Sequence, residues 1–191
     1  IVILFPEVKF DQKKFLAKVD QMVKKHGYCS VVVSEGVRWP DGRFLAESGR
    51  KDAFGHAQLG GAATVIAEMV GNELGHKNHW AVADYLQRAA RHIASKTDVD
   101  MAYAMGKAAV QLAIKGHNAV MPTVDRISNK PFKWKVGMAP LSRVANVEKM
   151  MPKNFITTDG FGITKKCRDY MQPLIKGEDY PPYKDGLPKY V

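Results

Sequence analysis

The sequence has few cysteines and no regular set of metal ligands, and each shortage excludes a class of protein. Cys29 and Cys167 are the only cysteines in the 191 residues, and they lack the close spacing of a zinc or redox pair. The six histidines form no paired metal-ligand pattern. We therefore expect neither a disulfide framework nor a structural zinc site.

Long apolar runs are also missing. No stretch of about eighteen apolar residues occurs, and no basic segment precedes an apolar one at the N-terminus. These absences indicate neither a membrane span nor a signal peptide, so we expect a cytoplasmic protein. A hydrophobic content of 46% with 25% charged residues is that of an ordinary globular chain, and one domain is the default expectation.

Positive charge is plentiful, and its distribution decides what it means. A formal net charge of +10 raises the question of a nucleic-acid partner. The lysines are scattered along the chain, however, and neither an RNP-like aromatic motif nor a zinc finger accompanies them. Nucleic acid therefore stays a third alternative behind the functions considered below.

The first residues predict an α/β fold. IVILF (1–5) has the pattern of a buried strand, a helix is expected from a cap at Asp11 to His26, and YCSVVVSEG (28–36) predicts a second buried strand. Apolar strands joined by a helix indicate a right-handed parallel crossover in a sheet covered on both faces. Because Ile1 lies inside an apolar run without an initiating Met, we expect the chain to be a fragment.

The later elements are predicted from apolar periodicity and turn residues. They are a loop or hairpin at 37–55, a helix at 58–75, a short strand at 79–85, a helix at 98–116 capped by Thr97, a pair of strands at 118–127 and 132–141, and a helix at 164–175. The stripe expected to face the core in the helix at 98–116 is Val99, Tyr103, Gly106, Val110 and Ala113. The Pro- and Tyr-rich tail at 178–191 is expected to lie strapped over the surface.

A basic cluster precedes the helix at 98–116. It holds Arg88, Arg91, His92 and Lys96, and Tyr85 lies just before it. Helix N-termini bind anions through free backbone N–H groups, and the planar fork of an arginine matches phosphate oxygens. The cluster predicts a site for a single phosphate. An exposed basic turn without a ligand is the alternative that the pattern leaves open.

Two glutamates follow the predicted strands, where open α/β sheets bind their ligands. Glu7 would accept hydrogen bonds from sugar hydroxyls, and a solvated carboxylate is the alternative. Glu35 in SEG has a similar position, with a turn or an internal salt bridge as its alternative. The Gly-rich FGHAQLGG, which contains His56, fits neither GxGxxG nor a phosphate-binding loop with its lysine.

Five segments in order resemble the C-terminal half of the pyrophosphate-dependent 6-phosphofructokinases. They are LFPEVKF, VVVSEGVR, GHAQLGG, YLQRAARHIASKTDVDMAYAMGKAAV and VANVEKMMPKNFITTDGFGIT. The resemblance covers residues 1–191 and implies a three-layer α/β fold with a mostly parallel sheet flanked by helices, followed by the Pro/Tyr-rich tail. It also implies reversible phosphoryl transfer from pyrophosphate to the 1-hydroxyl of fructose 6-phosphate, a reaction of glycolysis.

The resemblance assigns roles to individual residues. Pro6 and Glu7 match the Pro-Glu that supplies a carboxylate to the sugar at a strand end in the wider phosphofructokinase family. YLQR matches the family's His-x-Gln-Arg, so that Arg88 would bind the 6-phosphate. Tyr85 replaces the histidine of that motif, as an aromatic residue commonly does in the pyrophosphate-dependent members.

Further candidates for the 6-phosphate are less direct. The family contributes an arginine across a subunit interface about six residues before the His-x-Gln-Arg motif, and this chain has His79 there with Lys77 nearby. Arg91 has no family equivalent that we can assign, and its spacing from Arg88 makes it a second candidate. The shared interface implies a homo-oligomer, a dimer or a tetramer.

The resemblance also implies what this chain does without. The Gly-Asp motif that holds the phosphoryl donor and Mg2+, and the Thr-Ile-Asp-Asn-Asp catalytic loop, belong to the N-terminal half and do not occur here. We therefore expect no catalytic residue and no metal ligand in this chain, which would be inactive alone, with pyrophosphate and Mg2+ held by the N-terminal half. Two alternatives stay open, an ATP-dependent 6-phosphofructokinase and a non-catalytic sugar-phosphate-binding subunit.

Overall fold

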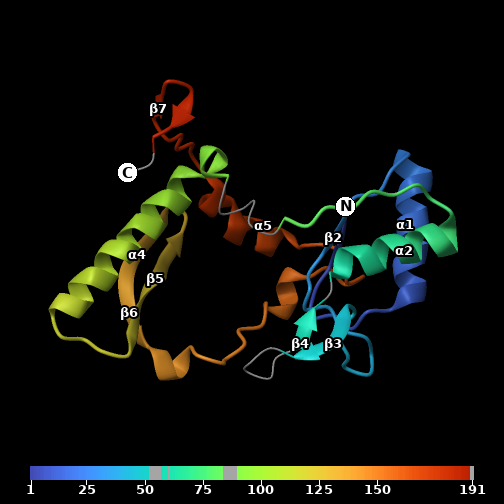
Figure 1. Ribbon diagram of the computed structural model, residues 1–191, viewed down its shortest axis with the longest axis horizontal. Coiled ribbons are helices and arrows are strands. Elements are labelled where there is room, and N and C mark those ends of the chain that lie inside the picture. The colour runs from blue at the N-terminus through green and yellow to red at the C-terminus, as the bar shows by residue number, and fades with distance from the viewer. Residues whose placement is uncertain (52–56, 60, 84–89, 190–191) are drawn as a thin grey trace. The chain divides into compact units, whose positions relative to one another are not determined.

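The computed structural model describes residues 1–51, 57–59, 61–83 and 90–189. The chain divides into two compact units (Figure 1). The first unit comprises residues 1–83 and 150–164, and the second comprises residues 84–149 and 165–191. Because residues 150–164 return to the first unit, the two are interleaved along the chain.

The first unit begins with the predicted strand, helix and strand. β1 (Val2–Leu4) pairs in parallel with β2 (Val31–Val33), and α1 (Gln12–His26) connects them. Asp11 caps α1 by accepting the backbone N–H of Lys14 at 3.1 Å. Gly27 ends the helix in the left-handed conformation with φ of 79°. The predicted strand, helix and parallel strand are confirmed, but β2 is not the buried strand that we expected, because its middle residue, Val32, is 56% exposed.

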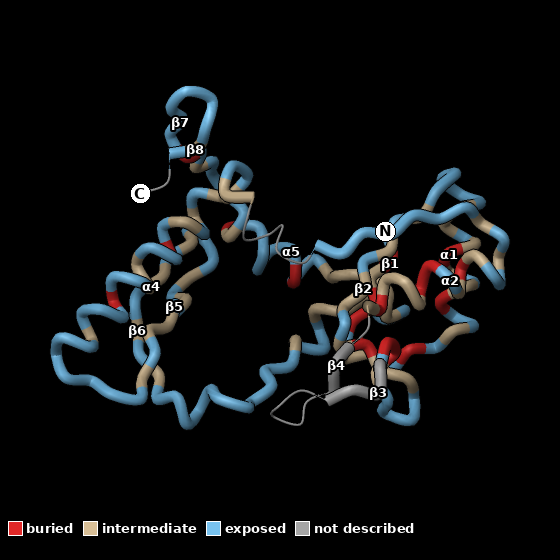
Figure 2. Tube along the Cα trace, viewed as in Figure 1, coloured by how far each residue is buried: buried red, intermediate tan, exposed pale blue. Residues whose placement is uncertain are grey.

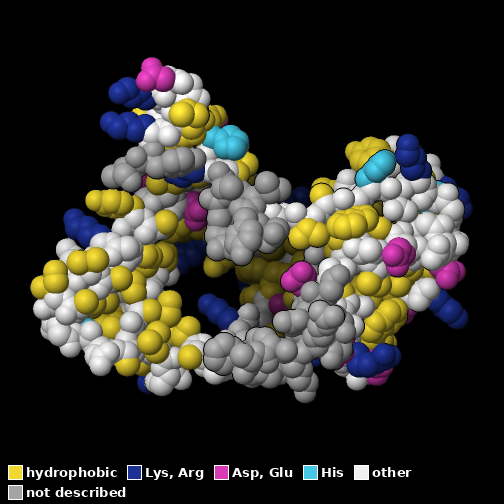
Figure 3. Space-filling model, viewed as in Figure 1, with side chains coloured by type: hydrophobic (Ala, Val, Ile, Leu, Met, Phe, Trp, Pro, Cys, Tyr) yellow, Lys and Arg dark blue, Asp and Glu magenta, His cyan; other side chains and the backbone are white. Residues whose placement is uncertain are grey.

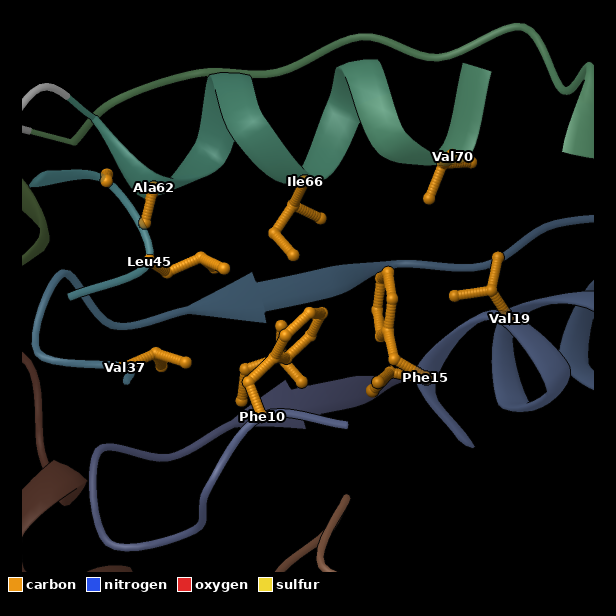
Figure 4. Close-up of a cluster of buried hydrophobic side chains, with 11 residues drawn as sticks. Phe10, Phe15, Val19, Val37, Leu45, Ala62, Ile66 and Val70 are labelled. Carbon is orange, nitrogen blue, oxygen red and sulfur yellow. The ribbon is translucent and has the colours of Figure 1, made fainter. Parts of the chain in front are cut away.

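The buried core of the first unit lies where α1 and α2 (Ala62–Leu74) cover the β1–β2 pair (Figures 2 and 4). Phe15 is fully buried on α1, and α2 faces it with a stripe at helical spacing that contains Ile66 and Val70. Phe10, before α1, packs its ring against Phe15 with the centroids 5.5 Å apart. Each such buried side chain contributes about 1.5–3 kcal/mol.

Two expectations for the first unit need correction. The predicted helix at 58–75 begins only at Ala62, because residues 57–59 form β4 (Ala57–Leu59), which pairs antiparallel with β3 (Glu47–Lys51). The predicted strand at 79–85 is absent from its described part, residues 79–83. There Trp80 is 54% and Val82 is 49% exposed, so this apolar stretch is not a buried strand in the described structure.

The second unit is built around a helix on a hairpin. α4 (Lys96–Ile114) packs on β5 (Val120–Asn129) and β6 (Phe132–Pro140), which pair antiparallel from Val120↔Pro140 to Asn129↔Phe132. This hairpin confirms the two predicted strands. The remaining elements are short: η1 (Arg91–Ile93), η2 (Leu141–Arg143), α5 (Lys165–Met171), η4 (Gln172–Ile175), β7 (Tyr183–Lys184) and β8 (Leu187–Pro188), with η3 (Lys153–Phe155) in the first unit.

The prediction of which face of α4 is buried was wrong. Met101 and Ala108 are buried, whereas Tyr103 is 75% and Val110 is 60% exposed. Both sides of this Ala-rich helix carry apolar residues, so periodicity alone does not select the face. Figure 3 shows hydrophobic side chains on the surface of the part that holds α4 and the β5–β6 hairpin.

The described helices and strands form an α/β structure in which each sheet has two strands. β1–β2 is parallel, while β3–β4, β5–β6 and β7–β8 are antiparallel. The expected class is confirmed, but a three-layer arrangement with a mostly parallel sheet is not present among the described residues. Within the same residues, no helix is long and apolar enough to cross a membrane.

Candidate functional site

Glu7 lies in the loop that follows β1, at the carboxyl end of the parallel pair. The backbone N–H of Ser34, just after β2, reaches the carbonyl of Leu4 at 3.3 Å. A side chain on Gly36 would come within 3.1 Å of Pro6, so the loops after β1 and β2 lie close together. This is the edge at which open α/β sheets bind ligands.

The carboxylate of Glu7 is fixed at one oxygen. Its Oε1 accepts the backbone N–H of Met151 at 2.8 Å, and the side chain is half-buried. Glu35, in the neighbouring loop, is exposed. Of the two strand-end glutamates, Glu7 is therefore the one with an ordered carboxylate, and none of the described residues donates a hydrogen bond to its second oxygen.

A loop around Asp159 holds the segment that brings Met151 to Glu7. Asp159 accepts hydrogen bonds from the Thr157 hydroxyl at 2.6 Å, the Phe161 N–H at 3.2 Å and the Lys18 ammonium at 2.9 Å. The carbonyl of Phe161 in turn accepts the N–H of Ile3 in β1 at 2.9 Å. Residues 150–164 are thereby attached to both α1 and β1.

The electrostatics of Asp159 follow from these contacts. The hydrogen bond from Thr157 and then the one from Lys18 lower the pKa of the carboxyl group to about 2. Our sequence reasoning assigned no role to this aspartate. The available signal was TTDGFG, where Asp precedes a glycine that adopts a φ of 78° at position 160.

The predicted phosphate ligands are distributed over both units. Tyr85 and Arg88 lie outside the described residues, as does His56. Lys77 and His79 are exposed in the chain that follows α2 in the first unit. His92, in η1 of the second unit, is also exposed.

Arg91 is engaged within the second unit. Its Nη2 lies 3.0 Å from Oδ1 of Asp179, and its Nη1 donates to the backbone carbonyl of the same residue. The side chains are 31% and 27% exposed, so this is a partly buried ion pair with a second hydrogen bond to the neighbouring backbone carbonyl. The guanidinium of Arg91 thus has an internal acceptor.

The N-terminus of α4 is also occupied by the chain itself. The cap is Ser95, whose Oγ accepts the N–H of Asp98 at 3.2 Å, and not Thr97 as predicted. The N–H groups of Lys96 and Thr97 bind the carbonyls of Gly177 and Lys176 at 3.1 and 3.2 Å. The donors that we expected to meet a phosphate therefore bind the C-terminal segment of this chain.

The described residues do not fit a bound metal ion. They contain no group of three or more His, Cys, Asp or Glu side chains that could hold one. Several of the described aspartates instead form ion pairs with lysines, such as Asp20 with Lys24 at 2.6 Å.

Two similar proteins of known sequence carry the same name. No protein-family model matches the chain. It is 64% identical over 191 residues to the pyrophosphate--fructose 6-phosphate 1-phosphotransferase of Methylococcus capsulatus, and 61% identical over 188 residues to that of Halomonas elongata. These alignments cover 100% and 98% of this chain but only 46% and 45% of the two relatives.

Solved structures give the same result. The crystal structure of pyrophosphate-dependent phosphofructokinase from Nitrosospira multiformis matches 100% of this chain with a TM-score of 0.81 at 68% identity, over 44% of its own chain. The one from Marinobacter aquaeolei matches 98% with a TM-score of 0.79 at 54% identity, over 43%. The chain spans somewhat less than half the length of its relatives, and it belongs to the pyrophosphate-dependent phosphofructokinase family.

Proposed function

We propose that this chain is the acceptor-binding part of an enzyme that transfers a phosphoryl group from pyrophosphate to the 1-hydroxyl of fructose 6-phosphate. The products are fructose 1,6-bisphosphate and phosphate, and the reaction is reversible. The observation that carries the proposal is 64% identity over all 191 residues to a protein named for this activity. The pyrophosphate-dependent relatives favour this donor over ATP.

In the proposed reaction the 1-hydroxyl oxygen forms a bond to a phosphorus of pyrophosphate while the bridging P–O bond breaks. The hydroxyl loses its proton and phosphate leaves. Such transfer depends on positioning and on neutralisation of charge more than on covalent catalysis. Because the described residues hold no ligand set for a cation, Mg2+ and pyrophosphate would bind mainly to the part of the enzyme that this chain does not span.

Glu7 is our candidate for the sugar hydroxyls. Oε1 is held by Met151, and because no described residue donates to the other oxygen, that oxygen would accept a hydrogen bond from the sugar ring. A carboxylate fixed in this way loses little conformational freedom when the substrate binds. The position at the carboxyl end of β1 supports this role.

Arg88 is our candidate for the 6-phosphate, with Tyr85 as a neutral neighbour. An arginine offers two parallel N–H groups to phosphate oxygens, and a tyrosine adds a donor without a further charge. Lys77 and His79, both exposed, are second candidates, with His79 at the position of the arginine shared between subunits. Arg91 is a weaker candidate because its guanidinium already binds Asp179.

The finer architecture is part of the same proposal. A two-stranded parallel sheet is marginal on its own, and Val32 of β2 is 56% exposed here. We propose that β1 and β2 belong to a three-layer, mostly parallel sheet completed by the part of the relatives' length outside this chain. The enzyme would work in the cytoplasm as a homo-oligomer, a dimer or a tetramer.

A donor assay on the full-length protein that contains this chain tests the function. Fructose 6-phosphate is supplied with Mg2+ and either pyrophosphate or ATP, and fructose 1,6-bisphosphate is followed through aldolase. We expect turnover with pyrophosphate and none with ATP. Turnover with ATP alone would identify the ATP-dependent enzyme, and binding of fructose 6-phosphate without turnover would identify a non-catalytic subunit.

A further inference from the structure

Residues 150–164, which we call the return segment, are attached to the first unit on both sides of the loop between β1 and α1. Before the loop, the N–H of Ile3 in β1 donates to the carbonyl of Phe161 at 2.9 Å. After the loop, the ammonium of Lys18 on α1 lies 2.9 Å from the carboxylate of Asp159. The loop that carries the candidate sugar ligand therefore lies between two attachments of one segment.

Two further contacts fall on the loop itself. The N–H of Met151 donates to Oε1 of Glu7 at 2.8 Å. Near the other end of the return segment, a Cβ added to Gly160 would lie 3.4 Å from Cγ1 of Val8, the residue next to Glu7. The return segment thus meets the loop at the glutamate and at its neighbour, so the position of the segment determines where the carboxylate of Glu7 is held.

The two oxygens of Asp159 serve different parts of this arrangement. Oδ1 accepts the hydroxyl of Thr157 at 2.6 Å and the N–H of Phe161 at 3.2 Å, which closes a turn inside the return segment. Oδ2 accepts the ammonium of Lys18 at 2.9 Å and ties that turn to α1. A substitution that changes only the second oxygen therefore separates the tie to α1 from the turn itself.

The exposure of the ion pair sets the size of the effect to expect. The side chains of Lys18 and Asp159 are 27% and 49% exposed, and partly exposed ion pairs are weak. A shift of about 1 Å in a group that binds substrate is nevertheless enough to weaken the productive geometry. Loss of the tie should therefore weaken binding through Glu7 about three- to fivefold and leave the fold intact.

We propose that Lys18 and Asp159 are positioning residues, which act through the backbone N–H of Met151 to hold the carboxylate of Glu7 in place for the hydroxyls of the sugar. The inference rests on the proposed function, because it takes Glu7 as the group that meets the substrate. The link runs from α1 through the return segment to Glu7, and each contact in it joins two described residues of the first unit. Neither Lys18 nor Asp159 touches the substrate in this arrangement.

The test uses two variants of the full-length enzyme. Asp159→Asn keeps an acceptor for Thr157 and Phe161 but turns an amide N–H toward Lys18, so it breaks the tie to α1 and keeps the turn. We expect it to raise the KM for fructose 6-phosphate about three- to fivefold, and Lys18→Met to do the same. The kcat and the KM for pyrophosphate should change less than about twofold in both variants.

Dependence on Glu7 distinguishes positioning from a general loss of structure. In a Glu7→Ala enzyme, the further change Asp159→Asn should raise the KM for fructose 6-phosphate no more, since the group to be positioned is already gone. The matched control is Lys24→Met, which removes a lysine from the same helix, where Lys24 pairs with Asp20 at 2.6 Å. Lys18→Arg, which keeps the positive charge opposite the carboxylate, should retain nearly the wild-type KM.

The outcomes separate the inference from the function on which it rests. An unchanged KM for fructose 6-phosphate in Asp159→Asn, beside a raised KM in Glu7→Ala, overturns the positioning role alone. A further rise when Asp159→Asn is added to Glu7→Ala also overturns it, as does an equal rise in Lys24→Met. No turnover of fructose 6-phosphate by the wild type overturns the proposed function and, with it, this inference.

A structural measurement checks the link between the ion pair and the glutamate. Hydrogen exchange in peptides that contain Met151 should quicken in Asp159→Asn, because the bond from its N–H to Glu7 loosens, while the peptides of α2 keep their protection. Lys18→Arg should exchange like the wild type in both regions. Faster exchange throughout the first unit would mean that the ion pair supports the whole fold, and it would contradict a local positioning role.

Discussion

Met151 donates its backbone N–H to Oε1 of Glu7 at 2.8 Å, across 144 positions of sequence. The bond joins the loop after β1 to residues 150–164, which belong to the first unit although they follow residues 84–149 of the second. It orients the one carboxylate that both the strand-end position and the family pattern select. The order of this glutamate therefore depends on residues remote from it in sequence.

Replacement of Glu7 tests its role toward the sugar. Glu7→Ala should raise the KM for fructose 6-phosphate by about tenfold or more, since a charged acceptor is lost, and Glu7→Gln should have a smaller effect because the amide oxygen can still accept. Initial rates at varied fructose 6-phosphate and saturating pyrophosphate measure both. Glu68→Gln, at an exposed position of α2, is the control. Equal KM values in all four proteins would remove Glu7 from the site.

Replacement of Arg88 tests the assignment of the 6-phosphate. Arg88→Ala should raise the KM for fructose 6-phosphate by about a hundredfold, because a charge-assisted pair of hydrogen bonds is lost, and leave the KM for pyrophosphate nearly unchanged. The exposed Arg143 provides the control Arg143→Ala. Fructose without the 6-phosphate should bind the wild type and Arg88→Ala equally weakly. An Arg88→Ala enzyme with normal affinity for fructose 6-phosphate would refute the assignment.

The local elements of this fold could be predicted from sequence because their signals are local. Asp11 and Gly27 mark the two ends of α1 by side-chain capping and left-handed geometry, and both act as expected. The apolar strands and the hairpin of β5 and β6 follow from periodicity and turn residues in the same way. These features depend on neighbours a few residues away.

What sequence alone could not supply are the contacts between distant segments. The hydrogen bond from Ser95 to Leu174 spans 79 positions of sequence and the bond from Met151 to Glu7 spans 144, and no local pattern encodes such pairs. The helix end that we expected to be open is filled by carbonyls of Lys176 and Gly177 for this reason. We predicted the wrong buried face for α4 because helical periodicity does not say against which face of the helix the neighbouring elements pack.

The Asp159 loop gives stability a pH dependence with a definite sign. Its pKa in the folded protein is about 2, below the usual value of 3.8, so the folded state binds the proton more weakly. The stabilisation is fully present above about pH 4 and is lost as the pH falls toward 2. Because the side chain of Asp159 is 49% exposed, we expect the ionised carboxylate to stabilise the folded state by only about 1 kcal/mol. Urea unfolding of wild type and Asp159→Asn should therefore differ at pH 7 and converge near pH 2, whereas a difference independent of pH would exclude the charge as its cause.

Three glycine-to-alanine variants separate backbone strain from close contact. Gly106 lies inside α4 with open space around it, so Gly106→Ala should stabilise the protein by about 0.5–1 kcal/mol through helix propensity and a less flexible unfolded chain. Gly116 has a φ of 80° but nothing near its missing side chain, so Gly116→Ala should cost about 1 kcal/mol. Gly177 adds to a φ of 76° a contact of 2.9 Å with Lys96, so Gly177→Ala should cost more, about 2–3 kcal/mol. Urea midpoints at equal slope measure all three. Equal losses of stability at Gly116 and Gly177 would mean that the Lys96 side chain moves aside at no cost, and that residues 174–179 bind the start of α4 without this close contact.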